Sequence, residues 1–120
     1  MRETKTTNPQ LIELISVLRK TSKEQNAPIW LDVADYLAKT RSTRIAVNLS
    51  SINRHTEKAD IVVVPGKILA SGTLNHSVTV ASFEASSVAK AKLATSNSTY
   101  ITIKELLEKN PTGSKVKIIR

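Results

Sequence analysis

Two carboxylates, Asp32 and Asp35, have a type and spacing that could do chemistry. Paired carboxylates can exchange protons with a substrate or hold a metal ion. The same pair near the start of a helix also describes a solvated face, where negative charge interacts favourably with the helix dipole. Lys39 follows Asp35 by one helical turn and favours the solvated interpretation. A small metal-dependent hydrolase using Asp32 and Asp35 therefore stays open as an alternative.

The rest of the chain offers little to a metal ion or a cofactor. His55 and His76 are the only two histidines, and there is no cysteine, whereas a tetrahedral metal site needs four donors. Gly66 and Lys67 are followed by Ile68 and lack the earlier glycine of a phosphate-binding loop. No Gly-x-Ser-x-Gly motif is present either. We therefore expect no metal, no cofactor and no enzymatic activity.

Basic side chains suit a different chemistry, the binding of phosphate groups. Several of them gather between residues 39 and 58, with Glu57 as the only acidic neighbour. Arginine can bond two phosphate oxygens at once, although such a cluster can also be a solvated surface. Asn53 and His55 lie beside Arg54 and could donate to phosphate or ribose, or serve as turn and surface residues. Lys67 follows a sequence typical of a type II turn, at 64–67, and could contact RNA or only solubilise the turn.

Composition favours a polyanionic partner. The chain has 120 residues with 18 basic and 10 acidic side chains, a net charge of +8. Nucleic acid is the first choice, and a membrane surface the second, because no amphipathic helix has an extended basic face. Aromatic residues are only 3% of the chain, so we expect contacts with phosphate and ribose rather than stacked bases. Neither a long apolar run nor a signal peptide is evident, which predicts a cytoplasmic protein.

The elements that must position these residues begin with helices. Residues 1–7 read as an extended basic arm. Asn8 and Pro9 suit a helix start, and apolar spacing predicts a helix over about 9–23. A second helix is predicted over about 30–39, which makes a helical hairpin. Trp30 could stack on a base, but its place in the apolar stripe predicts core packing with its N–H hydrogen-bonded.

Strands and helices mix in the remainder. Apolar alternation or β-branched runs predict strands near 45–49, 61–64, 78–81, 100–103 and 116–119. Short helices are expected after Ser50 or Ser51, after Ser86 or Ser87, and over 104–110. This mixture predicts the α/β class. We expect a single domain over 1–120, with a basic arm at 1–7, a helical extension at 8–40 and an α/β core at 41–120.

Two segments resemble a known family: Val47-Asn48-Leu49-Ser50-Ser51-Ile52-Asn53-Arg54 and Val62-Val63-Val64-Pro65-Gly66-Lys67-Ile68-Leu69. They are similar to the archaeal and eukaryotic large-subunit ribosomal protein eighteen family, whose core fold is shared with bacterial large-subunit protein fifteen. Further matches begin at Lys5, Ala27, His76 and Leu106, so that the likeness covers most of the chain. The family usually has a Gly-x-Gly turn at 70–72 and paired glycines near 95–98. At the second position we expect Asn97 to take the left-handed conformation.

The resemblance implies an irregular superhelix of strand-strand-helix units with an N-terminal helical hairpin. It also implies a non-enzymatic structural constituent of the large ribosomal subunit, bound as a monomer to ribosomal RNA and neighbouring ribosomal proteins in the cytoplasm. The leading alternative is a free-standing basic nucleic-acid-binding module. The residues expected to bind RNA are Arg2, Lys5, Lys39, Arg41, Arg44, Asn53, Arg54, His55, Lys58 and Lys67.

Overall fold

The computed structural model describes residues 9–38 and 45–120, and these form two compact units. The helical unit contains described residues 9–38 and 104–114, and the sheet unit contains residues 45–103 and 115–120. The single domain expected from the sequence stays a prediction. The expected N-terminal arm and the linker cations Lys39, Arg41 and Arg44 lie outside the described residues.

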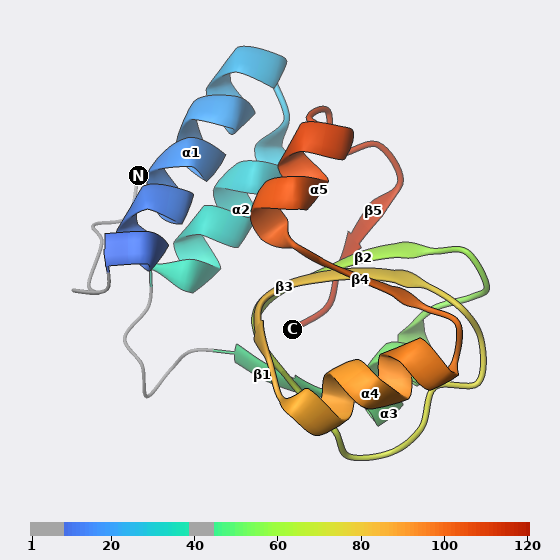
Figure 1. Ribbon diagram of the computed structural model, residues 1–120. Helices are drawn as coiled ribbons and strands as arrows, with labels where there is room; N and C mark the ends of the chain where they lie inside the picture. Colours follow the sequence, from blue (N-terminus) through green and yellow to red (C-terminus); the bar gives the residue numbers. More distant parts are fainter. Residues whose placement is uncertain (1–8, 39–44) are drawn as a thin grey trace. The chain divides into compact units, whose positions relative to one another are not determined.

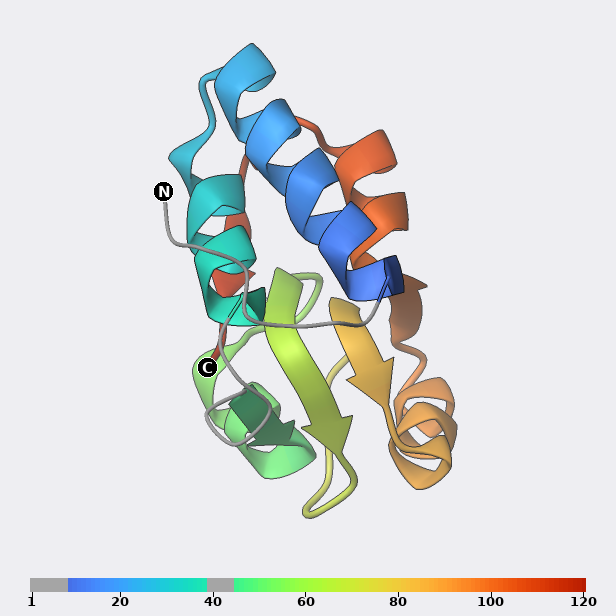
Figure 2. The ribbon, with the colours of Figure 1, turned by 90° about the vertical axis from the view of Figure 1, so that its left-hand side faces the viewer.

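The helical unit is built on α1 (Pro9–Gln25), α2 (Pro28–Leu37) and α5 (Ile103–Lys109). The three helices lie side by side (Figure 1, Figure 2). A proline opens α2, as suits the first helical turn, and Asn26 makes the bend before it with φ of 51°. Apolar residues at helical spacing, Leu11, Ile15 and Leu18, are buried. The predicted helical hairpin is confirmed, although α1 ends about two residues later than predicted and α2 begins and ends about two residues earlier.

Trp30 is the largest buried side chain of the helical unit, with 0% of its surface exposed. Its indole Nε1 donates a hydrogen bond of 2.7 Å to the carbonyl oxygen of Pro111. This bond joins α2 to the segment that follows α5. Core packing with a satisfied N–H was the expectation for Trp30, and it is confirmed.

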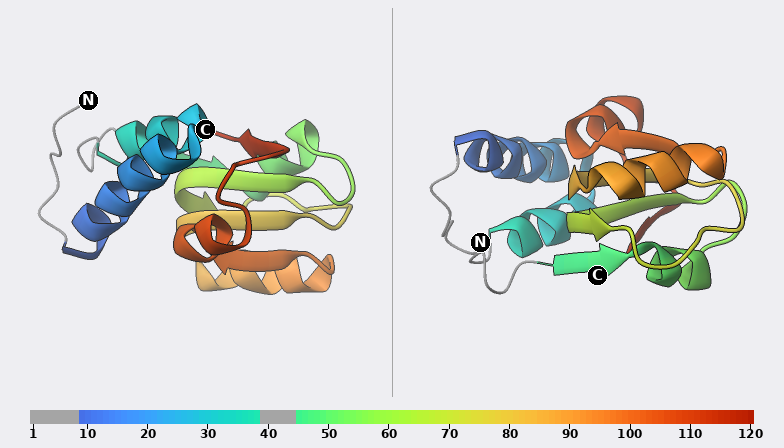
Figure 3. Two further views of the ribbon diagram at one scale, coloured as in Figure 1. Left: turned by 90° about the horizontal axis from the view of Figure 1, so that it is seen from above. Right: turned by 60° about the horizontal axis from the view of Figure 1, so that its bottom comes forward.

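The sheet unit carries five strands, β1 (Ile45–Asn48), β2 (Ile61–Leu69), β3 (Thr79–Ala85), β4 (Thr99–Thr102) and β5 (Val116–Ile118). All pair in parallel in the order β1-β2-β3-β4, and β5 pairs with β2. The view from above shows the strands side by side (Figure 3). β1 pairs with residues 66–69 of β2, whereas β5 pairs with residues 61–63. The predicted α/β class is confirmed.

Two helices, α3 (Leu49–His55) and α4 (Ser87–Thr95), connect parallel strands. Both contribute to one apolar core cluster: Val47, Leu49, Ile52, Val62, Val64, Ile68, Leu74, Val78, Val80, Ala89, Leu93 and Ile119. Ser86 caps α4, because its Oγ accepts a hydrogen bond of 3.1 Å from the backbone N–H of Ala89. Beyond the helix, Asn97 has φ of 60°. The expected cap and the expected left-handed asparagine are both confirmed.

The type II turn predicted at Val64–Lys67 is wrong. Residues 61–69 form one strand, β2, with a register shift between Val64 and Lys67. Gly66 is not among the residues with positive φ, which a type II turn would require at its position. The chain stays extended because β1 pairs with this part of β2 on one side and β3 on the other. Proline and glycine mark a bulge here, so Lys67 is exposed on a strand rather than on a turn.

Gly72 is a position where the loop between β2 and β3 requires glycine. Its φ is +88°, and an added Cβ would lie 2.5 Å from Ser50 Cβ and 3.0 Å from Ser50 Cα. Replacement of Gly72 by Ala should lower the free energy of unfolding by about 1–3 kcal/mol, measured by denaturant titration. The neighbouring Ser71→Ala is the control, expected to change it by about 0.5 kcal/mol or less. Equal stability of the two variants would mean that this close approach does not constrain the loop.

No helix in the described part of the chain has the length and apolar character needed to cross a membrane.

Candidate nucleic-acid interface

The end of α3 presents three of the residues predicted to bind RNA. Arg54 and His55 occupy its last turn, and Lys58 follows in the connection to β2. All three are exposed. Basic groups are stabilised at this end of a helix because its carbonyls carry partial negative charge. The structure therefore brings these three predicted residues together.

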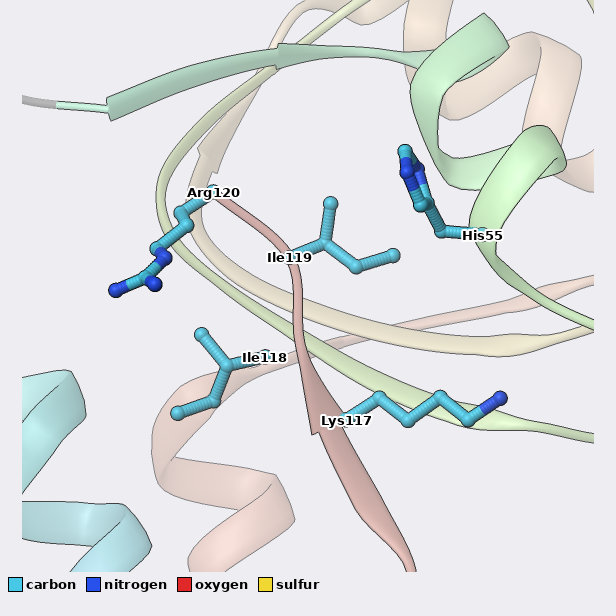
Figure 4. Close-up of a pocket in the computed structure, with 5 residues that line it drawn as sticks. All are labelled: His55, Lys117, Ile118, Ile119 and Arg120. Atoms are coloured by element: carbon cyan, nitrogen blue, oxygen red, sulfur yellow. The ribbon is translucent and has the colours of Figure 1, made fainter.

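The C-terminal segment adds two basic residues that the sequence did not predict: Lys117 in β5 and Arg120 beyond it. β5 pairs with the start of β2, with Lys117 opposite Val62. This pairing places the C-terminal segment next to the end of α3. A hollow of about 430 Å³ results, lined by His55, Lys117, Ile118, Ile119 and Arg120 (Figure 4). We call Arg54, His55, Lys58, Lys117 and Arg120 the basic cluster.

Alternation of apolar residues at 116–119 does reveal a strand in the sequence. It does not reveal which strand is its neighbour, so Lys117 and Arg120 could not be assigned to the end of α3. Lys117 and Arg120 are identified only by the parallel pairing of β5 with β2.

Lys117 is held in the basic cluster by Asp60. The Lys117 Nζ lies 2.8 Å from Asp60 Oδ2, and the same oxygen accepts a hydrogen bond of 2.8 Å from the backbone N–H of Glu57. The hydrogen bond from Lys117 lowers the pKa of the Asp60 carboxyl, and the Glu57 N–H lowers it further. The hydrogen bond to Asp60 raises the pKa of Lys117. The pair is partly exposed, so it positions the lysine more than it stabilises the fold.

The pair should make a pH-dependent contribution to stability. Because the pKa of Asp60 is depressed in the folded state, its contribution is present above the unfolded value of about 3.9 and is lost as pH falls through the folded value. Asp60→Asn should lower the melting temperature slightly at neutral pH. The difference between wild type and variant should shrink on acidification toward about pH 2. An equal difference at both pH values would contradict a charge-based pair.

Two further residues predicted to bind RNA, Asn53 and Lys67, are not members of the basic cluster. Asn53 Oδ1 accepts a hydrogen bond of 2.8 Å from the backbone N–H of Asn75, which ties α3 to the loop after β2. Lys67 is exposed in β2, in register with Ala46 and Glu84. It lies six residues beyond the start of the strand, roughly 20 Å along it. The structure does not bring Lys67 into the basic cluster. The remaining predicted residues, Arg2, Lys5, Lys39, Arg41 and Arg44, lie outside the described residues.

Carboxylates and the second histidine form no comparable site. Within residues 9–38 and 45–120, no group of three or more His, Cys, Asp or Glu side chains could hold a metal ion. Asp32 is exposed on α2 and Asp35 is half-buried.

His76 contacts the hydroxyl of Thr56. Thr56 Oγ1 donates a hydrogen bond of 2.7 Å to the Ile52 carbonyl oxygen. His76 Nε2, also 2.7 Å from this hydroxyl, must therefore donate to Thr56 Oγ1. His76 therefore braces the end of α3.

Charge is distributed unevenly between the two units. The sheet unit has eight basic and three acidic side chains, a net charge of +5. The described part of the helical unit has five basic and six acidic side chains, a net charge of −1. The positive potential of the described residues therefore arises from the sheet unit.

Fold and charge together define a small basic α/β protein with a cation cluster at one end of a parallel sheet. No family model matches the chain. It is 42% identical over 119 residues to the large ribosomal subunit protein eL18 of Methanococcus maripaludis, covering 99% of both chains. It is 44% identical to eL18 of Methanosphaerula palustris (97% and 96% covered) and 42% identical to eL18 of Halobacterium salinarum (95% and 97%). The chain belongs to the large ribosomal subunit protein eL18 family.

Proposed function

We propose that this chain is a structural, non-enzymatic constituent of the large ribosomal subunit, located on cytoplasmic ribosomes, and that it binds ribosomal RNA through the sheet unit. Membership in the eL18 family supports the ribosomal role. The observation that carries RNA binding is the basic cluster at the end of α3. Three of its members, His55, Lys117 and Arg120, come from two segments far apart in the sequence and line one hollow. Arg54 and Lys58 lie next to His55 in the chain.

The chemistry of the cluster suits the sugar–phosphate backbone of RNA. Guanidinium and ammonium groups bind phosphate oxygens, and contacts of this kind fix position rather than read sequence. None of the four aromatic side chains is fully exposed to bases: Trp30 is buried, and Tyr36, Phe83 and Tyr100 are half-buried. The Lys90 ammonium also lies 5.4 Å from the ring centroid of Tyr100. Recognition by charge and shape is the usual mode for structured RNA.

Salt dependence tests this proposal directly. Four phosphate contacts by Arg54, Lys58, Lys117 and Arg120 should give a slope of log affinity against log salt of about −2.8 to −3.6. Filter binding to large-subunit ribosomal RNA at several salt concentrations measures it. A slope near that of one contact would defeat the basic-cluster account.

Cosedimentation separates the ribosomal role from a free-standing nucleic-acid-binding module. The tagged protein should travel with large subunits in a sucrose gradient at moderate salt. Recovery on unrelated nucleic acid, with none in the large-subunit fraction, would favour the alternative.

For the neighbouring ribosomal proteins we propose the helical unit as the contact side. A hollow of about 210 Å³ between α1 and α5 is lined by Val17, Thr21, Glu24, Gln25, Lys104, Leu107, Glu108 and Pro111. Its apolar residues stand beside two glutamates and one lysine, and the described part of this unit is near-neutral, which suits a protein neighbour better than RNA. Cross-linking within purified large subunits should therefore join this hollow to protein and the basic cluster to RNA.

A further inference from the structure

We infer that the Nε2 atom of His55 accepts a hydrogen bond from a ribose 2′-hydroxyl, so that the basic cluster distinguishes RNA from DNA. The inference rests on the proposed binding of RNA by this cluster. It assigns one atom to the one group that ribose has and deoxyribose lacks.

The position of the proton on His55 follows from its hydrogen bond. Its Nδ1 lies 2.8 Å from the backbone carbonyl oxygen of Ser51, one helical turn earlier in α3. A carbonyl oxygen can only accept, so Nδ1 must carry the proton. Neutral imidazole has a single ring N–H, which leaves a lone pair on Nε2. The bond to Ser51 also fixes the ring against its own helix, so this acceptor is held in place before any ligand arrives.

His55 differs in this respect from the other histidine. The Nε2 of His76 is a donor already engaged by Thr56. Within the described residues, the contact with Ser51 is the one hydrogen bond of the His55 side chain, which is exposed at the hollow. Neutral His76 keeps its lone pair on Nδ1, but His76 is not among the residues that line the hollow. His55 is therefore the imidazole that presents an acceptor there.

The surroundings of His55 match the alternation of groups along an RNA backbone. Lys117 and Arg120 extend in opposite directions from the C-terminal segment, and Ile119 lies between them near the ring of His55 (Figure 4). Two cations and one hydrogen-bond acceptor thus line the same hollow. A ribonucleotide chain presents phosphates on both sides of each ribose, so cations and acceptor can find complementary partners on it. The hollow of about 430 Å³ is within the range of small-ligand sites, about 300–1,000 Å³.

Paired substitutions isolate the acceptor atom. His55→Asn places an amide nitrogen near the position of Nδ1, retaining a donor for the Ser51 carbonyl but removing the group at Nε2. His55→Gln places an amide oxygen near the position of Nε2 and so retains an acceptor. The probe is the fragment of large-subunit ribosomal RNA that the wild-type protein protects from nuclease. It is synthesised in the ribose form and in a 2′-fluoro form, which keeps the phosphates and A-form geometry but has no hydroxyl donor.

Dissociation constants are measured at about pH 8, where imidazole is mostly neutral, on variants whose melting temperatures match the wild type. Wild type should bind the 2′-fluoro probe about three- to tenfold more weakly than the ribose probe, the effect of one hydrogen bond. His55→Asn should bind both probes equally, and His55→Gln should keep the preference. Equal wild-type binding of both probes, a preference kept by His55→Asn, or a preference lost in His55→Gln would each overturn the inference. Failure of wild type to bind either probe at low salt would instead overturn the proposed function.

Discussion

Replacement of Arg54, Lys58 and Arg120 by glutamine should weaken binding to large-subunit ribosomal RNA by at least about tenfold at low salt. A charge-assisted hydrogen bond is worth about 1.5–3 kcal/mol before losses to solvent and side-chain ordering, and three such contacts are removed. All three side chains are exposed, so the melting temperature should stay nearly unchanged. Filter binding measures the affinity, and the salt slope should fall in magnitude by about 2–3.

The matched control for this variant removes the same charge from the helical unit. Lys23, Lys104 and Lys109 are exposed there and can be replaced by glutamine together. The control should keep an affinity within about threefold of wild type, because these lysines are not members of the basic cluster and salt screens charges that make no direct contact with phosphate. If the control loses as much affinity as the test variant, binding follows net charge and the basic cluster is not a localised site.

Trp30→Ala should destabilise the protein by about 3–5 kcal/mol, the usual cost of emptying a large aromatic site. The indole is fully buried in the helical unit, and its truncation also leaves the Pro111 carbonyl without its hydrogen bond. Chemical denaturation followed by circular dichroism measures the change. A cost of this size is a large part of the stability of a small domain.

Trp30→Phe separates the two contributions. The smaller ring keeps much of the apolar contact but has no N–H, so its cost should be clearly less than that of alanine. A variant with alanine that keeps full stability and loses RNA affinity would show that Trp30 stacks on a base, contrary to its burial.

The sequence by itself determined the elements and the family. Local signals were sufficient for the helix that begins at Pro9 and the Ser86 cap, and the glycines usual in the resembled family indicated the left-handed Asn97. Each depends on a residue's own backbone preference or on partners within one helical turn, which the sequence displays directly. The apolar stripe that contains Trp30 likewise predicted its burial. The resemblance in the two segments at 47–54 and 62–69 agrees with the eL18 relatives.

Only the tertiary structure decided how these elements meet. It kept Pro65 and Gly66 inside β2, because strands pair on both sides and outweigh the local preference for a turn. It grouped residues 104–114 with α1 and α2. It set β5 against β2, which brought Lys117 and Arg120 to His55 and left Lys67 at the far part of the strand. The choice of a parallel neighbour depends on contacts between residues far apart in the chain, and no local pattern records it.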